Sequence, residues 1–497
     1  MDPHMSQQNH SNLADTFHAL GARYGARSAL VSGARSVSFA GLVATSAQWA
    51  RQFQAEGLKA GDQVGLVLRD SVDTVLAMVA IWMLDAVAVP IDFRNRADER
   101  GRLSEEFDLA ALLEDRDLSN GAYRSIACDA GWKDTAARHS DAPVERKGTE
   151  SHPALISLTS GTTGRPLGIV ASHRTIQLRS FGYGFEAHYP FEGKFLNAYP
   201  LSFSASRNHT IGQLMRGATV CFHPPIFAAD ELIEKVNSQG ITFLFAVPAT
   251  VKAMLGLSNG TGKPLMPDLK MLYCGGSGME AHDKLRAWQE LTPGFLHCFS
   301  SSVSGTCSVL AGADVASHSH TDGRVLPTVR LEIVDEDHTP LPAGEVGALR
   351  VRSHGMAEGM YKNRARDTGD KIRDGWAYTG DLAKVSTDGF LTVVGRSSDM
   401  IIRGGANVYP AEIETVLQAV PGVADVAVTG FASVEFGEEI AAFVVAKSGV
   451  TEGDLAAECR VQLAPDKRPR KFIFLDSLPR NTNGKVLRRE LRASLES

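Results

Sequence analysis

Short apolar runs alternate with amphipathic segments along the first half of the chain, and this order limits the folds it can adopt. Residues 62–68 (DQVGLVL) predict a buried strand, residues 71–86 (SVDTVLAMVAIWMLDA) a helix, and residues 87–92 (VAVPID) the next strand. The same order returns in ATVCFHP, AADELIEKVNSQG, ITFLFAVP and ATVKAMLGL, with the first of these helices ending at Gly240. A strand, a helix and a second strand in succession predict parallel β-α-β units.

The pattern changes from about Val329. The stretch VRLEIVDEDHTPLPAGEVGALRVRS alternates at period two around proline and glycine turns, which predicts antiparallel strands. After a joint near Ser398, the chain predicts a helix in YPAEIETVLQAV, strands in VADVAVTGF and EIAAFVVAKSG, and a helix from Glu452. We therefore expect an α/β fold: a large N-terminal domain (residues 6–397) of layered α/β subdomains plus a β-rich subdomain, and a small α+β C-terminal domain (residues 399–497).

Size and composition agree with more than one globular domain but leave the function open. The chain has 497 residues, 43% of them hydrophobic and 22% charged, as in soluble globular proteins. Its net charge of −6 gives no reason to expect nucleic acid or an anionic membrane as a partner. The most apolar run is interrupted by Asp85, and no charged segment with a following apolar stretch opens the chain, so we expect no targeting segment, no membrane span and a cytoplasmic location. The first residues, MDPHM, resemble a vector-derived leader before a start at Met5.

The spacing of the cysteines predicts packed side chains and not metal ligands or a redox pair. They show no C-x-x-C pair and no zinc-ligand spacing, so we expect reduced and mostly packed thiols, with one reactive thiol as the alternative. The six are Cys128, Cys221, Cys274, Cys298, Cys307 and Cys459.

One loop combines hydroxyls and glycines in the way that phosphate binding requires. Residues 158–168, LTSGTTGRPLG, follow the expected strand ALISL. Glycines let successive backbone N–H groups converge on one anion, and serine and threonine hydroxyls add donors. The alternative is a merely polar turn. We call residues 159–164, TSGTTG, the hydroxyl loop.

Two familiar catalytic motifs are missing. The P-loop pattern G-x-x-x-x-G-K-[ST] fails at Gly262 and at Gly484, although each is followed by a lysine. The G-x-S-x-G elbow of α/β-hydrolases is also absent, because GGSGM places its glycines in the wrong register around Ser277. A P-loop kinase or ATPase and a serine hydrolase are therefore disfavoured.

Five motifs in order make the chain similar to the superfamily of adenylate-forming enzymes, which includes acyl-CoA synthetases, peptide-synthetase adenylation domains and luciferases. They are LTSGTTGRPLG, YCGGSG, YTGD, GRSSDMIIRGGANVYPAEIE and LPRNTNGKVLRRELR, and they cover nearly the whole chain. The resemblance implies a mobile C-terminal domain that rotates between adenylation and thioester formation. By position the hinge is Ser398, where relatives usually carry Asp or Lys.

The resemblance also assigns roles to individual residues. Adenylation joins two anions, a carboxylate and the α-phosphate of ATP, so it needs positive charge and positioning. Lys485 matches the catalytic lysine that bridges these groups, and an exposed tail lysine is the alternative. Asp381 in YTGD matches the residue that accepts hydrogen bonds from both ribose hydroxyls. The alternative is an aspartate that only takes part in a turn. Arg396 matches an arginine that holds ribose or phosphate.

The remaining nucleotide contacts implied by the resemblance come from backbone and hydroxyl groups. The hydroxyl loop would hold the β- and γ-phosphates, a glycine turn would lie against adenine, and Ser302 fits the family's aromatic-Gly-x-Thr-Glu segment. The implied cofactors are ATP, Mg²⁺ and coenzyme A. The residues concerned are Thr159, Ser160, Gly161, Thr162, Thr163, Gly164, Gly275, Gly276, Ser277 and Ser302.

The sequence departs from the family pattern at three places. Leu167 replaces a lysine that in relatives lies near the phosphates. Val303 replaces a glutamate that normally helps to coordinate magnesium, although Mg²⁺ also binds through substrate phosphates and water. Phe203 and Ser204 follow the PL pair where a histidine is common, and His209 comes later.

The acid pocket is expected from SFSASRNH, AVPAT, CGGSG and SSSVSG, whose small and apolar side chains favour an aromatic or short acyl acid. Arg207 and His209 are alternative contacts for a second polar or anionic group of the substrate, or else a surface cation and a satisfied histidine. The candidate pocket residues are Phe203, Ser204, Arg207, His209, Val247, Val303 and Gly305.

The motif GGANVYPAEIE is more similar to acyl-CoA synthetases than to peptide-synthetase domains, which favours coenzyme A as the acceptor. The expected activity is ATP-dependent activation of a carboxylic acid to an acyl-adenylate with release of pyrophosphate, followed by transfer to coenzyme A to give an acyl-CoA and AMP. Two alternatives stay open. The acceptor is a stand-alone acyl carrier protein, which suits the basic tail from Arg460, or the chain is a catalytically weak homologue that binds acyl-adenylate. We expect a monomer or a homodimer.

Overall fold

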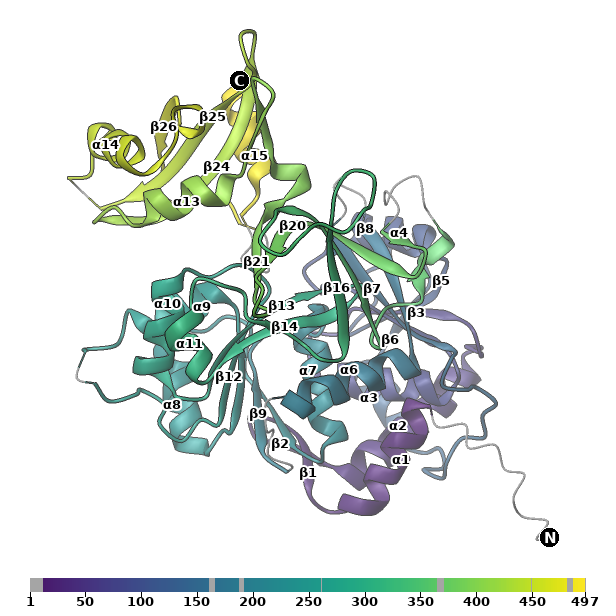
Figure 1. The fold of residues 1–497 in the computed structure, drawn as a ribbon. Helices are drawn as coiled ribbons and strands as arrows, with labels where there is room; N and C mark the ends of the chain where they lie inside the picture. The colour runs from purple at the N-terminus through teal and green to yellow at the C-terminus, as the bar shows by residue number, and fades with distance from the viewer. Residues whose placement is uncertain are drawn as a thin grey trace, which may run out of the picture.

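The computed structural model describes residues 12–160, 166–186, 192–260, 262–363, 371–447, 449–480 and 486–496. Two large α/β sheets make up most of the molecule, a smaller antiparallel sheet follows them, and a fourth sheet belongs to the C-terminal residues (Figure 1). In the view of Figure 1 the yellow-green C-terminal part stands above the rest and joins it through the end of β21. This is the α/β architecture expected from the sequence.

The first α/β sheet is mostly parallel and has nine strands in the described residues. Its parallel centre runs through β13, β12, β11, β9 and β10, with helices between successive strands, so the β-α-β prediction for this half is confirmed. Across the sheet the strands are β15 (Arg324–Val325), β14 (Gly305–Ala311), β13 (Phe295–Ser301), β12 (Met271–Cys274), β11 (Phe243–Ala246), β9 (Lys194–Asn197), β10 (Thr219–Phe222), β1 (Ser28–Ser32) and β2 (Arg35–Ser38).

The second α/β sheet has its parallel part at β4, β3 and β5, as the first apolar runs predict. In sheet order its strands are β18 (Gly359–Met360), β8 (Pro166–Ser172), β7 (Pro153–Ser160), β4 (Val87–Pro90), β3 (Gln63–Leu66), β5 (Leu109–Glu114) and β6 (Ser125–Ala127). One core joins both sheets, because α3 (Ser71–Met83) is buried along almost its whole length in a cluster with residues of each. A helix that is apolar on all sides needs such a place between layers.

The other helices of this part cover the two sheets and connect their strands. They are α1 (Leu13–Tyr24), α2 (Phe39–Ala55), α4 (Ala97–Glu106), α5 (Ala130–Ala136), α6 (His173–Glu186), α7 (Ser204–Met215), α8 (Ala229–Gln239), α9 (Pro248–Leu255), α10 (Ala281–Arg286) and α11 (Ala313–His318). As predicted, α8 ends at Gly240, which adopts a left-handed conformation with φ of 61°.

The β-rich part begins where the sequence pattern changes. Its strands pair antiparallel, which confirms the prediction from period-two alternation. They are β16 (Val329–Val334), β17 (Gly347–Ser353), β20 (Trp376–Val385), β19 (Ile372–Arg373) and β21 (Leu391–Arg396).

The C-terminal residues form an α+β unit around cores of their own, whose buried members all lie between residues 401 and 491. The strands are β23 (Ala406–Val408), β22 (Ile401–Arg403), β25 (Gly437–Ala446), β24 (Val423–Ser433) and β26 (Lys471–Phe474), and the helices are α13 (Pro410–Gln418), α14 (Glu452–Gln462) and α15 (Arg488–Glu496). The predicted joint, Ser398, lies in the single 3₁₀ turn Ser397–Asp399 between β21 and β22.

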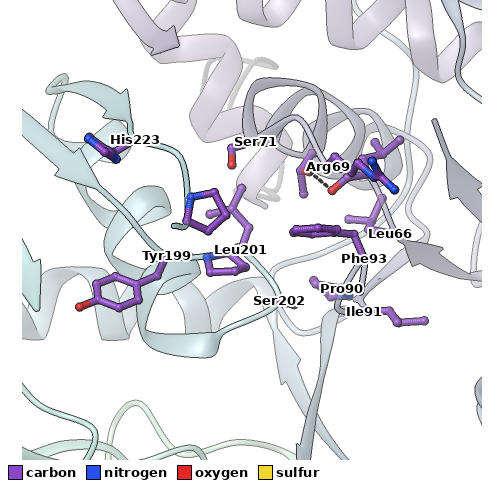
Figure 2. Close-up of a pocket in the computed structure, with 14 residues that line it drawn as sticks. Leu66, Arg69, Ser71, Pro90, Ile91, Phe93, Tyr199, Leu201, Ser202 and His223 are labelled. Atoms are coloured by element: carbon purple, nitrogen blue, oxygen red, sulfur yellow. Dashed lines mark hydrogen bonds between the residues drawn. The ribbon is translucent and has the colours of Figure 1, made fainter. Parts of the chain in front are cut away.

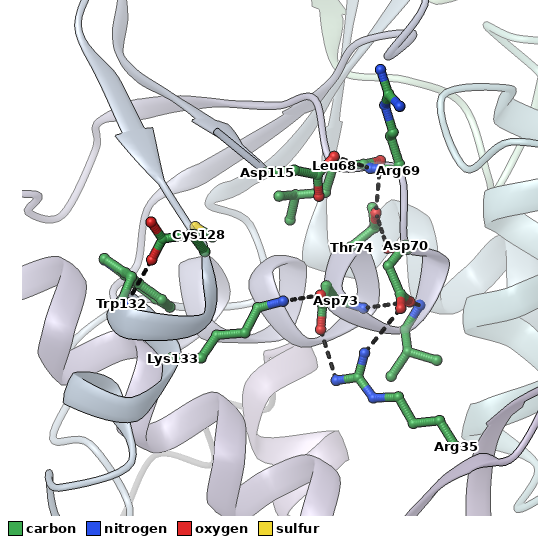
Figure 3. Close-up of polar contacts among 12 residues, drawn as sticks. Arg35, Leu68, Arg69, Asp70, Asp73, Thr74, Asp115, Cys128, Trp132 and Lys133 are labelled. Carbon is green, nitrogen blue, oxygen red and sulfur yellow. Dashed lines mark hydrogen bonds and ion pairs between the residues drawn. The ribbon is translucent and has the colours of Figure 1, made fainter. Parts of the chain in front are cut away.

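Buried charges are paired where β3 and β5 end. Asp73 on α3 is only 2% exposed, and its two oxygens accept from Arg35 at 2.7 Å and Lys133 at 2.5 Å (Figure 3). Nearby, the buried Arg100 donates to the buried Glu114, which also accepts from two hydroxyl groups. We call these five residues the paired network.

The six cysteines are all free and buried, as expected. Burial raises the pKa of Cys298 and of Cys307 to about 12, which keeps both as protonated thiols at neutral pH. No helix in the part of the chain described by the structure is long and apolar enough to span a membrane.

Candidate functional site

The hydroxyl loop joins the two strands of an antiparallel hairpin. In the register of β7 and β8, Thr159 lies opposite Leu167 and Ser160 opposite Pro166. The loop residues Gly161, Thr162, Thr163 and Gly164 fall outside the described residues. The sequence predicts the strand before the loop but not the one after it.

The end of this hairpin next to the loop is tightly packed, which explains its apolar sequence. Leu167 is 5% exposed, so it is a buried strand residue. A Cβ atom at Gly168 would lie 2.5 Å from Cε1 of Phe107 and 2.9 Å from Cγ2 of Ile156, which leaves room only for glycine. The strand after the loop therefore needs these residue types for packing.

The glycine turn of YCGGSG follows β12 at the carboxyl ends of the parallel strands. A Cβ at Gly275 would lie 2.7 Å from Sγ of Cys298, and Gly276 has a φ of 99°. The Cβ position at Gly276 lies 3.7 Å from the ring of Phe203 and 3.9 Å from Cγ1 of Val247. Three predicted residues, from segments far apart in sequence, thus meet at the edge where α/β sheets bind ligands.

The predicted ribose acceptor and its arginine lie side by side. Asp381 on β20 and Arg396 on β21 are direct cross-strand partners, and Nη1 of Arg396 donates to Oδ1 of Asp381 at 3.1 Å. The Asp381 backbone N–H donates to the Thr379 hydroxyl at 3.1 Å, which helps to fix this segment. Asp381 is 7% exposed.

Lys371 stands near this pair, and the sequence analysis did not single it out. Burial lowers the pKa of Lys371, and the charge of Arg396 lowers it further. No motif marks this lysine in the sequence, because its neighbours in space come from two strands that follow it along the chain.

Arg179 on α6 is a second residue that the sequence analysis missed. Its Nη2 donates to the carbonyl oxygens of Ser302 and Val303, both at 3.0 Å, and its Nε donates to that of Gly355 at 2.7 Å. The Cβ position at Gly305, where φ is 77°, lies 3.6 Å from the Arg179 side chain. Arg179 therefore holds the segment that carries three predicted site residues.

Val303 is 6% exposed and packs with Ile169, Ala357 and Ala377, so this position contributes apolar packing. Within the described ranges no three His, Cys, Asp or Glu side chains come together in a way that could hold a metal ion. The described residues therefore offer no such set of side-chain ligands for a divalent ion.

The side chains of Arg207 and His209 make contacts in different parts of the molecule. His209 is 2% exposed, with its ring centroid 4.5 Å from that of Tyr273 and 5.0 Å from that of Phe245. Burial lowers its pKa to about 3, so it is neutral at pH 7. Arg207 is 1% exposed and donates to the hydroxyl of Ser157 at 2.5 Å. Neither is a surface cation. Ser204, the first residue of α7, is half-buried.

A pocket opens between the two α/β sheets close to the predicted acid-binding stretch (Figure 2). Its walls come from the carboxyl ends of β3 and β4 and from the segment before α7, and they include Leu66, Arg69, Phe93, Tyr199, Leu201, Ser202 and His223. The Arg69 guanidinium lies 6.0 Å from the centre of the Phe93 ring. No sequence motif predicts this pocket.

The predicted hinge is tied to the C-terminal unit. The Ser398 hydroxyl donates to the carboxylate of Asp399 at 3.0 Å, and the other Asp399 oxygen lies 3.8 Å from Arg488. Arg488 also donates to Glu414 on α13 at 2.6 Å. Lys485, three residues before Arg488, falls outside the described residues.

The fold and these motifs define a class of nucleotide-binding enzyme with a large N-terminal part and a small C-terminal unit. Residues 17–361 match the family described as AMP-binding enzyme, and residues 412–485 match the AMP-binding enzyme C-terminal domain. This chain therefore belongs to the AMP-binding enzyme family, as its motifs predict.

Similar proteins of known activity span nearly its whole length. The 2-succinylbenzoate–CoA ligase of Bacillus licheniformis is 30% identical over 475 residues, covering 94% of this chain and 96% of the relative. The long-chain-fatty-acid–CoA ligase FadD13 of Mycobacterium tuberculosis is 29% identical over 471 residues, covering 92% of each. The solved structure of ATP-bound MatB from Rhodopseudomonas palustris superposes with a TM-score of 0.89 at 25% identity, covering 98% of this chain and 99% of that one.

Proposed function

We propose that this chain is an AMP-forming acid–CoA ligase. It activates an aromatic or short acyl carboxylic acid with ATP to an acyl-adenylate, releases pyrophosphate, and transfers the acyl group to coenzyme A. The cross-strand pair of Asp381 and Arg396 is the observation that carries the proposal, because it places an acceptor carboxylate and a forked cation together. Membership of a family whose similar proteins are acid–CoA ligases supports it.

In this proposal Asp381 accepts the ribose hydroxyls of ATP and Arg396 orients that carboxylate or a phosphate. The hydroxyl loop receives the β- and γ-phosphates. The glycine turn at Gly275 and Gly276 provides a surface without side chains for the adenine ring. Lys485 brings the positive charge that lets the acid's carboxylate approach the α-phosphorus.

The acid is placed beside Phe203 and Val247, which both lie within van der Waals reach of the Cβ position of Gly276. Such a wall suits a ring or a short acyl chain, and the acid's carboxylate then points toward the nucleotide. ATP-dependent ligation of this kind uses Mg²⁺, for which the described residues offer no cage. The ion is therefore assigned to the phosphates and water.

The small C-terminal domain (399–497) turns about Ser398 relative to the N-terminal domain (6–397), so that Lys485 leaves the site after adenylation and coenzyme A reaches the acyl-adenylate. The 3₁₀ turn between two sheets supports this assignment, because a few residues between elements can absorb a large change in backbone dihedral angles.

The test is pyrophosphate release from purified protein with ATP, Mg²⁺ and a panel of carboxylic acids, followed by AMP and acyl-CoA formation with coenzyme A. We expect Lys485→Ala to lower the rate of adenylation roughly 10²- to 10³-fold, as for loss of one preorganised donor. Lys447→Ala, at an exposed position of the same domain, is the matched control and should leave the rate unchanged. Wild-type adenylation by the Lys485 variant would refute the proposed chemistry.

The buried Leu167 and Val303 favour a second candidate, a weak enzyme or a homologue that binds acyl-adenylate without making it efficiently, because both positions carry no charge. No pyrophosphate release with any acid of a broad panel, together with tight binding of acyl-adenylate, would support that candidate. Comparing AMP release with coenzyme A and with a holo carrier protein identifies the acceptor.

A further inference from the structure

Asp322, two residues before β15, ties the edge of the first α/β sheet to β21 of the antiparallel sheet. Its Oδ2 atom accepts from the backbone N–H of Val393 at 2.9 Å. Two backbone hydrogen bonds flank this contact: the Asp322 N–H donates to Leu391 at 2.7 Å, and the Leu391 N–H donates to Gly323 at 2.9 Å. Arg396 lies three residues after Val393 on the same strand, so this junction fixes the strand that carries Arg396.

The other oxygen of the Asp322 carboxylate faces the first sheet. Oδ1 accepts from Nζ of Lys284 on α10 at 3.4 Å and lies 3.8 Å from Nδ1 of His297 on β13. Lys284 is 3% exposed and also donates to the carbonyl of Thr321 at 2.8 Å. His297 is 1% exposed, and its Nε2 lies 3.4 Å from the carbonyl oxygen of Ser277 in the glycine turn. We call Asp322, Lys284 and His297 the bridging cluster.

The chain around Asp322 is held closely against β14. The Ser308 hydroxyl donates to the Asp322 carbonyl oxygen at 2.7 Å. A Cβ atom at Gly323, where φ is 95°, would lie 2.1 Å from the carbonyl carbon of Val309, so the two backbones touch. Asp322 is therefore a fixed point between the two sheets.

The bridging cluster links two halves of the candidate site that come from different sheets. On one side are Ser277, which faces His297, and α10, which follows the glycine turn and carries Lys284. On the other side is β21, whose Arg396 pairs with Asp381. A buried ion pair is weak evidence for stability, because well-packed apolar residues often replace one without loss. Its hydrogen bonds do, however, fix the distance between the groups that they join.

We propose that Asp322 is a positioning residue for the nucleoside of ATP: it sets the separation between the glycine turn and the pair of Asp381 and Arg396. This inference rests on the proposed function, which assigns adenine to the turn and ribose to the pair. Two linked groups of one ligand bind together strongly only when their two sites lie at the matching separation. Loss of Asp322 therefore weakens a ligand that spans both sites, and leaves a ligand that reaches only one of them unaffected.

The experiment compares Asp322→Ala with the wild type, using AMP as the spanning ligand and adenine as the ligand of one site. Calorimetry gives the dissociation constant of AMP, competition with AMP gives that of adenine, and pyrophosphate release gives the KM values. We expect the constants for AMP and ATP to rise about tenfold, and those for adenine and the acid to change by less than about twofold. An unchanged constant for AMP, or an equal loss for AMP and adenine or for AMP and the acid, would overturn the assignment.

A matched control separates positioning from a general loss of stability. Glu114→Ala also removes a buried carboxylate that binds a buried cation, but in the second α/β sheet, and it should leave the AMP constant unchanged. An equal loss of AMP affinity in this control would overturn the proposal.

A conservative pair of substitutions tests whether the contacts themselves position the strand. Asp322→Asn with Lys284→Gln removes both charges but keeps an oxygen for Val393 and a donor for Thr321. It should recover most of the AMP affinity, and no recovery would count against the proposed contacts. Should Asp322→Ala fail to fold, Asp322→Glu keeps the charge and lengthens the side chain. It is expected to weaken AMP binding severalfold with adenine binding unchanged, and no change for either ligand would overturn the proposal.

The outcomes also separate this inference from the proposed function. A wild-type protein that binds AMP and turns over, with unchanged constants in Asp322→Ala, refutes the inference alone. A wild-type protein that binds AMP without turnover still tests the inference through the dissociation constants, whereas the proposed function fails. A wild-type protein that binds neither AMP nor ATP refutes both.

Discussion

Two buried arginines in two regions of the molecule have opposite surroundings. Arg100, in the paired network near the end of β5, is 5% exposed and donates to Glu114, which is 1% exposed. Arg207, near the end of β7, is 1% exposed and meets only neutral oxygens in the described residues. The comparison teaches that burial alone does not define a role. A cation with its own acid is neutralised within the fold, whereas a cation that meets only neutral oxygens keeps an uncompensated charge in the interior.

The two carboxylates of the paired network, Glu114 and Asp73, each accept hydrogen bonds from more than one side chain. Glu114 accepts from Arg100 and also from Tyr123 at 3.0 Å and Ser125 at 2.7 Å. Burial and the charge of Glu114 raise the pKa of Tyr123 to about 12. Asp73 similarly binds two cations (Figure 3). Both carboxylates of the paired network are therefore paired with cations inside it.

The largest expected loss of stability is that of the Arg100→Met variant, and it tests the difference between the two arginines. Breaking a buried ion pair leaves Glu114 buried and uncompensated, so we expect a loss of about 3–5 kcal/mol in the free energy of unfolding. Arg207→Met removes a charge that has no partner and should cost less than about 2 kcal/mol, because only neutral acceptors lose a donor. Urea unfolding followed by circular dichroism measures both. Equal losses would remove the distinction between the two arginines.

A matched control for Arg100→Met replaces both partners. In Arg100→Met with Glu114→Leu no buried charge is left alone, so the pair should cost less than Arg100→Met by itself. A double variant that is less stable than the single one would show that packing of the arginine stem, and not the charge pair, dominates at this place.

A smaller loss is expected for Asp73→Asn. The change removes the charge that binds Arg35 and Lys133, but both cations are partly exposed, at 39% and 35% of their side chains, and can turn to solvent. We expect about 1–3 kcal/mol, as for a lost hydrogen bond to a charged group. The same urea unfolding measures it, and Asp70→Asn, whose carboxylate is more exposed, serves as the comparison.

The smallest expected effect is the change in stability with pH that comes from His209, two residues after Arg207 on α7. Burial lowers the pKa of His209, and also those of His173 and His297, to about 3. Between about pH 6.5 and 3 the unfolded chain binds more protons at these sites than the native one, so stability falls as the pH is lowered through 6.5. We expect a loss of about 1 kcal/mol per histidine from pH 6.5 to 5.5. His209→Phe should reduce this pH dependence by one histidine's share, and an unchanged slope would mean that His209 is not buried in its neutral form.

His209 and Arg207 also show two responses to burial on one helix. A histidine can lose its proton near neutral pH and sit among aromatic rings at little cost. An arginine keeps its charge across the ordinary pH range and therefore needs an anion. The three-residue stretch Arg207–His209 thus carries a neutral histidine packed among aromatic rings at one end and a buried arginine at the other.

Much of the fold was predictable because its signals are local. Apolar periodicity predicted β3, α3 and β4, and glycine marked the end of α8. The strand β8 was missed because its seven residues begin with a proline directly after a loop, with no helix-sized segment between it and β7. The pairing of β1 with β10, which brings Leu30 beside Val220, has no local signal at all.

The candidate site likewise has residues that sequence motifs predict and residues that only the fold brings together. The motifs that carry Asp381 and Arg396 are short, and a hairpin makes the two residues direct partners, so their pairing follows from the order of residues in the chain. Arg179 acts on residues from a distant segment and Lys371 lies near residues of two strands that follow it, and nothing nearby in the sequence distinguishes either from other cations. The contact between Phe203, Val247 and Gly276 likewise depends on how three strands and a helix lie together.

The sequence by itself determined the alternation of strands and helices, the α+β C-terminal unit and membership of the AMP-binding enzyme family, because each is encoded in residues close together in the chain. Only the tertiary structure decided which buried charges have partners. Whether an arginine meets a glutamate or a serine depends on segments up to tens of residues apart, and the cost of an unpaired charge arises only once the fold has removed the water around it.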